Sequence, residues 1–133
     1  MPIPPKISHK IEDGILVVTV EGWIKMLEMA AYASDHIVEW ASNPCLLWDF
    51  RTTIFFDFTS EVLTNISDTF AQASRVRAGW RTALVVRKEE SLLGDLVVEL
   101  TKSHNVPVEH QVFLSMGEAR SWLVEFSPES VVN

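Results

Sequence analysis

Two kinds of hydrophobic pattern alternate along the chain, short strand-like runs and longer helical stretches. Residues 7–12 alternate apolar and polar positions, whereas residues 15–20 are almost continuously apolar. The Asp13-Gly14 pair between them is typical of a tight hairpin, because both positions accept a positive φ. The run Cys45-Leu46-Leu47-Trp48 has no polar alternation, which favours a strand buried on both faces. We therefore predict an antiparallel edge hairpin and an interior strand over residues 45–48.

Helical spacing of apolar residues separates the strands. It predicts helices over residues 23–41, 60–78, 91–104 and from the Ser115–Glu118 capping box to about 126, with further strands over 81–87 and 108–114. The element order is then β-β-α-β-α-β-α-β-α. Strands that alternate with helices form right-handed crossovers, so we predict an α/β fold with a mixed, mostly parallel sheet and flanking helices.

Size and charge narrow the function classes. The 133 residues suit a single domain over 1–133, with an irregular arm at 1–6 and an irregular tail at 127–133. A formal net charge of -7 argues against nucleic acid as a partner. The chain has no apolar run near the ~20 residues that span a bilayer, and its first residues, MPIPPK, lack the features of a signal peptide. We expect a cytoplasmic protein without a membrane span.

Sequence motifs for catalysis or cofactor binding are absent. The lone Cys45 has no CxxC partner and is expected to be a core thiol, and no HxH or HExxH pair occurs among the histidines, which are His9, His36, His104 and His110. We therefore predict no metal site. The sequence has no GxSxG elbow, its glycines are isolated, and we favour structural roles for Asp49 and Asp57 over a catalytic carboxylate pair. We expect neither a cofactor nor enzymatic activity.

Charged and aromatic residues are concentrated in two places. The basic residues Arg75, Arg77, Arg81, Arg87 and Lys88 are interpreted as solvated charge in preference to an anion or headgroup site. Four phenylalanines lie within nine residues, at Phe50, Phe55, Phe56 and Phe58, around a predicted loop at residues 51–53. They either pack in the core or form an exposed patch for a partner or a ligand. We predict a homodimer whose apolar interface includes part of residues 50–58.

Residues 46–61 resemble the signature of STAS domains, the anti-sigma factor antagonist fold. In that family a buried strand, a short polar turn and an apolar pair precede Asp-Ser-Ser-Gly-Leu at the start of a helix. Leu46-Leu47-Trp48-Asp49-Phe50 resembles the strand, Phe55-Phe56 the pair and Asp57 the aspartate. Thr59 falls at the position of the phosphorylated serine, whereas Phe58, Ser60 and Glu61 depart from the motif.

Residues 7 to 124 as a whole are more similar to the SpoIIAA-like branch, small bacterial proteins related in fold to STAS and to lipid-binding Sec14 (CRAL-TRIO) domains. The similarity rests on residues 14–22, on Val112-Phe113-Leu114-Ser115, and on Glu118-Ala119 and Trp122-Leu123. The resemblance implies a regulatory or protein-interaction module.

In such a module the segment around Thr59, with Asp57 and Ser60, would be the site of phosphorylation or partner binding. A simpler role for Thr59 is a helix N-cap. The alternative function that the resemblance implies is a carrier of a lipid or acyl ligand, with the phenylalanine cluster lining the pocket.

Overall fold

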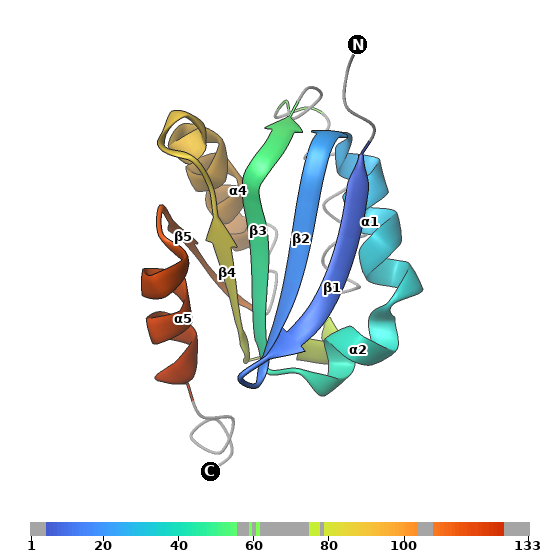
Figure 1. Ribbon diagram of the computed structural model, residues 1–133, viewed down its shortest axis with the longest axis vertical. Helices are drawn as coiled ribbons and strands as arrows, with labels where there is room; N and C mark the ends of the chain where they lie inside the picture. Colours follow the sequence, from blue (N-terminus) through green and yellow to red (C-terminus); the bar gives the residue numbers. More distant parts are fainter. Residues whose placement is uncertain are drawn as a thin grey trace.

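The fold is a five-stranded mixed sheet flanked by helices (Figure 1). The computed structural model describes residues 5–55, 59, 61, 75–77, 79–103 and 108–126. The strands are β1 (Lys6–Glu12), β2 (Ile15–Ile24), β3 (Cys45–Phe55), β4 (Arg81–Val85) and β5 (Glu109–Phe113), and they lie in this order across the sheet. β1 pairs antiparallel with β2, and the other neighbours are parallel. The predicted α/β class is confirmed.

Helices lie on both faces of this sheet, in the part of the chain that the structure describes. They are α1 (Met26–Asp35), α2 (Ile37–Ser42), α4 (Ser91–Ser103) and α5 (Met116–Val124), with 3-10 turns η1 (Arg75–Arg77) and η2 (Lys88–Glu90). In Figure 1, α1 and α2 lie on the β1 side of the sheet and α5 lies near β4 and β5. A search of the described residues finds no helix whose length and apolar content would let it cross a membrane.

Strand alternation sends neighbouring side chains of β2 and β3 to opposite faces, each with its own core. One core contains Val18, Trp48 and Phe50 from the sheet and Met29 and Trp40 from α1 and α2. The other contains Val17 and Leu47 and is covered by Ala119 and Leu123 of α5. Leu46 and Leu47 are only 2% and 0% exposed on the middle strand, which confirms the predicted interior strand.

The first hairpin and the last helix have the local geometry that the sequence predicts. Asp13 and Gly14 have φ of 52° and 79°, and the strand register closes directly around them at Glu12 and Ile15. At the start of α5, the Ser115 hydroxyl accepts a hydrogen bond from the Glu118 backbone N–H at 3.3 Å, as a capping residue does.

Both central strands are longer than the sequence pattern suggests. Glu21-Gly22 does not end β2, because Glu21 and Gly22 continue the pairing with Thr52 and Thr53, and Gly22 does so at a φ of 82°. Trp23 therefore belongs to the strand and not to the following helix. The predicted loop at residues 51–53 is also wrong, since β3 runs through it to Phe55.

The predicted helix over residues 23–41 is two helices, which meet at His36. Leu27 and Val38, predicted to face inward, lie off the buried side of these helices and are 66% and 73% exposed. Ala33 and Trp40 are buried in their place. The predicted helix over residues 60–78 lies outside the described residues except at 61 and 75–77, where residue 61 is helical and 75–77 form η1.

Candidate functional site

The predicted regulatory segment follows the end of β3. Thr59 is exposed, four positions beyond Phe55, which is the last residue of the strand. The other predicted members of this segment, Asp57 and Ser60, lie outside the described residues, as do Phe56 and Phe58. The described part of the site is therefore Thr59 and the strand ends beside it.

The two described phenylalanines of the predicted patch pack inward. Phe50 is 4% exposed and stacks on Trp48 with ring centroids 5.6 Å apart and planes 10° from parallel. Phe55 is half-buried and meets Phe50 edge to face at 5.3 Å. Phe50 is thus a core residue, which decides between the two roles left open for the phenylalanines and removes Phe50 from the predicted ligand or interface patch. Without the expected loop at residues 51–53, strand alternation keeps its ring on the inner face.

Asp49 forms an ion pair with Arg51 on the face of the sheet opposite Phe50. It is 7% exposed, and Arg51 donates to it through its backbone N–H at 3.1 Å, through Nε at 2.9 Å and through Nη2 at 2.9 Å. Burial alone would raise the pKa of Asp49, but the hydrogen bonds and charge of Arg51 outweigh burial and lower this pKa. Asp49 is therefore held as a carboxylate, which suits a structural role better than proton transfer.

A second surface lies at the carboxyl ends of β2 and β3, beyond the register shift between the two strands. Beyond this shift, Glu21 pairs with Thr52 and Trp23 pairs with Ile54, while the alternate residues Ile24 and Phe55 belong to the helix-covered core. Glu21, Thr52, Trp23 and Ile54 therefore lie on the face of the sheet opposite Ile24 and Phe55. We call these four residues the β2–β3 outer surface. Trp23 is 37% exposed and Ile54 is half-buried, so this surface offers an apolar centre with polar neighbours.

Three of the five basic residues contact groups within the protein, and Arg77 is not solvated, which contradicts the predicted solvated charge at this residue. Arg77 is 2% exposed and donates to backbone carbonyls and to Thr82. Arg81 lies over the ring of Trp122 at 4.6 Å. Arg87 donates to the Thr53 carbonyl at 2.9 Å. The sequence gives no sign of these roles, because each depends on groups from distant segments.

A groove of about 730 Å³ lies between α4 and β5. Its lining is mostly charged or polar and comprises Asp95, Val98, Glu99, Lys102, Val108, Glu109, His110, Gln111 and Val112. The pKa of His110 is lowered to about 4, mainly by burial. The hydrogen bond to the Val108 carbonyl acts to raise this pKa, and the charge of Arg77 acts to lower it. His110 is therefore a neutral imidazole at pH 7.

The structure brings together three potential metal ligands that the linear motifs did not predict. One ligand atom from each of His9, His36 and Glu39 lies within 4.8 Å of the others. Two signals for this cluster were present in the sequence. His9 shares the alternation of Ile7 and Ile11, which places it on the inner face, and His36 and Glu39 have the i, i+3 spacing of helical neighbours.

Comparison with known proteins identifies the fold. No family model and no curated protein sequence matches the chain. Among solved structures, the chain is similar to an anti-sigma factor antagonist from Mycobacterium paratuberculosis, with a TM-score of 0.59 and 17% identity, over 91% of this chain and 95% of that one. It is also similar to an uncharacterized DUF3478-family protein with a SpoIIAA-like fold from Shewanella loihica, with a TM-score of 0.54 and 14% identity, over 90% and 93%. The chain has the SpoIIAA-like, anti-sigma factor antagonist fold.

Proposed function

We propose that this SpoIIAA-like domain is a non-enzymatic regulatory module that binds a protein partner through the β2–β3 outer surface and the adjoining Thr59. The observation that carries the proposal is the position of Trp23, an aromatic residue left 37% exposed beside Ile54 at the carboxyl ends of two parallel strands. Binding sites of open α/β sheets lie at such strand ends, and tryptophan is enriched among the residues that dominate interface energies.

Two further observations support a regulatory role. One of the proteins with this fold is named as an anti-sigma factor antagonist, a name that describes action on another protein. Thr59 is exposed two positions before helical residue 61. A phosphate added there adds roughly two negative charges, enough to change the affinity of an adjoining protein surface.

Photo-crosslinking tests this surface. A photoreactive phenylalanine analogue at position 52, an exposed residue of the β2–β3 outer surface, is expected to capture a protein from a lysate of the source cells. Trp23→Thr and Thr59→Asp are each expected to weaken capture at least about tenfold, the loss of one central interface residue. Thr59→Ser and Val38→Thr, the latter at a 73% exposed apolar residue elsewhere, are the matched controls and should capture normally. Equal capture by Trp23→Thr and Val38→Thr would contradict the proposed surface.

The alternative function, a carrier of a lipid or acyl ligand, requires an apolar cavity. The groove between α4 and β5 does not supply one, since Asp95, Glu99 and Lys102 are in its wall. Native mass spectrometry of the purified protein separates the two functions. A mass increase from a bound lipid supports the carrier, and a protein-only mass supports the interaction module.

We also propose that the domain forms a homodimer. Because Phe50 is a core residue, the predicted apolar interface is narrowed to the later part of residues 50–58. Phe56→Asp leaves the Phe50–Phe55 contact in place and is expected to weaken the dimer. Sedimentation equilibrium measures this, and a monomer for the unmodified protein at high micromolar concentration would refute the dimer.

A further inference from the structure

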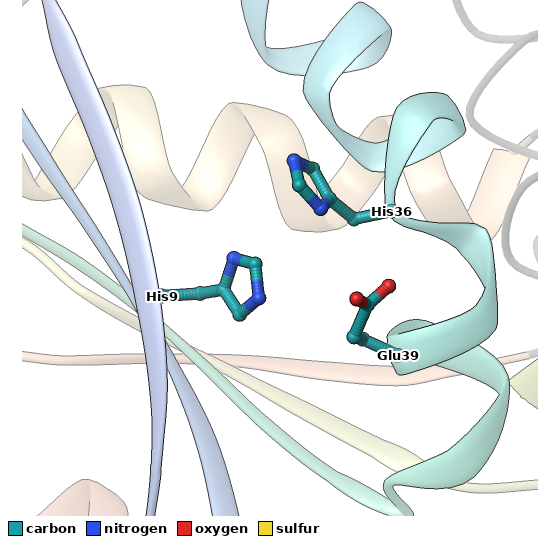
Figure 2. A group of neighbouring side chains, drawn as sticks. All are labelled: His9, His36 and Glu39. Atoms are coloured by element: carbon teal, nitrogen blue, oxygen red, sulfur yellow. The ribbon is translucent and has the colours of Figure 1, made fainter.

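Two imidazoles and one carboxylate converge between the edge strand and the helices (Figure 2). His9 lies in the middle of β1 opposite Val18, a core residue, so its ring projects toward the helices. His36 is the residue between α1 and α2, and Glu39 is in the first turn of α2. All three side chains are half-buried.

His36 lies at the break between α1 and α2, and this break directs its side chain toward the sheet. His36 has φ of -115° and ψ of 32°, outside the helical region, although its N–H still donates to the Tyr32 carbonyl at 3.1 Å. Glu39 follows three positions later, so its side chain lies on the same side of the backbone. Figure 2 shows both side chains directed toward His9.

Tyr32 supplies a partner behind the His9 ring. Its hydroxyl lies 2.5 Å from Nδ1 of His9, which leaves Nε2 as the available ligand atom. A hydroxyl can accept from Nδ1–H, and that tautomer carries a lone pair on Nε2. Metal-binding histidines usually have such a partner on their other nitrogen.

We propose that His9, His36 and Glu39 bind a divalent transition-metal ion with the ligand preferences of zinc. Ligand atoms at about 2.0–2.2 Å from a tetrahedral zinc ion are about 3.4 Å apart, so a cluster already within 4.8 Å contracts by at most about 1.5 Å. Two imidazoles exclude Mg²⁺ and Ca²⁺ as the preferred ions, since these take oxygen ligands. The bound ion would connect β1 to α1 and α2, independently of the proposed partner surface.

Isothermal titration of the untagged protein with zinc chloride tests the site. One zinc ion per chain is expected to bind with a dissociation constant in the micromolar range or below. Glu39→Gln, which keeps the shape of the side chain, and His36→Gln are each expected to weaken binding at least about tenfold, because each removes one of three ligands. Circular dichroism confirms that these variants fold.

Matched controls separate this site from general zinc binding at surface groups. His110→Gln changes a histidine outside the cluster, and Glu28→Gln changes an exposed carboxylate of α1. Both are expected to bind zinc as the unmodified protein does. Cobalt binding should give visible absorption bands that His36→Gln loses. The site is refuted if zinc does not bind saturably, or if Glu39→Gln and His36→Gln bind it as tightly as the controls do.

Discussion

Replacing Arg77 with methionine is expected to lower the free energy of unfolding by about 3 kcal/mol, from the balance of hydrogen bonding and charge burial at this site. The guanidinium is 2% exposed. It donates to the carbonyls of Asn43, Pro44 and Arg81 at 3.3, 3.1 and 2.7 Å and to the hydroxyl of Thr82 at 2.5 Å. These partners precede β3 or begin β4, so the side chain ties together the ends at which two central strands start.

Two opposing terms set this magnitude. A buried acceptor left without its donor costs about 1–3 kcal/mol. The carbonyls of Asn43 and Arg81 and the Thr82 hydroxyl lose this donor, which costs roughly 6 kcal/mol together, whereas the Pro44 carbonyl keeps the Arg81 N–H at 3.3 Å. Burial lowers the pKa of Arg77 from its ordinary value to about 10, and this difference corresponds to roughly 3 kcal/mol for keeping the guanidinium charged inside the protein. Methionine removes that second cost. The net loss of about 3 kcal/mol lowers the melting temperature by about 10 °C for a domain of this size.

Urea unfolding followed by tryptophan fluorescence measures the change, with calorimetry as a second method. Arg75→Met is the matched control, because Arg75 lies in the same turn but is exposed, and it should change stability by less than about 0.5 kcal/mol. Arg77→Lys keeps the charge without the planar array of donors and should be at least as destabilising as Arg77→Met. If Arg77→Met matches Arg75→Met, the carbonyls do not depend on the guanidinium. If it is more stable than the unmodified protein, charge burial outweighs hydrogen bonding.

Three further changes test the packing and the buried groups. The pKa of His110 is about 4 in the folded protein, compared with the ordinary histidine value of 6.5. Between pH 4 and pH 6.5 the unfolded chain therefore binds more protons than the folded protein does. Stability should therefore fall by about 2.5 kcal/mol as the pH drops from 6.5 to 4, and a His110→Gln variant that shows the same slope in urea unfolding would contradict this. Gly94→Ala should destabilise the protein by about 1–3 kcal/mol in the same assay, because the added Cβ would lie 3.0 Å from the Val112 methyl groups; an unchanged stability would show that α4 shifts freely. Burial raises the pKa of the Cys45 thiol, so iodoacetamide at pH 8 should modify it at least about tenfold more slowly than it modifies a free cysteine peptide, and equal rates would refute the burial argument.

The sequence predicted the sheet better than its irregularities. The interior strand at residues 45–48, the hairpin at Asp13-Gly14 and the cap at Ser115 follow from local patterns, and the structure confirms them. Gly22 is different, because a glycine after a strand is compatible both with the end of that strand and with its continuation. Pairing with β3 decides between them, and that pairing is not visible in the sequence of β2 alone.

The candidate sites, too, could be predicted only where they depend on one continuous segment of the sequence. Thr59 was found from a resemblance in one continuous segment, and the structure describes it as exposed. The convergence of His9 with His36 depends on how β1 packs against the helix junction, 27 positions later in the chain. Arg77 has no local sign of burial, because its partners come from the loop before β3 and the start of β4.

The order of the strands in space is the order of their synthesis. Each strand from β2 to β5 pairs with the strand made just before it, so no later strand has to insert between two earlier ones. On a translating ribosome the sheet can therefore grow outward from the first hairpin, one edge at a time. Its last covering, Ala119 and Leu123 of α5, arrives only when most of the chain has emerged. Until then the nascent sheet presents Val17 and Leu47 to its surroundings, and this is the interval in which a chaperone has an apolar face to bind.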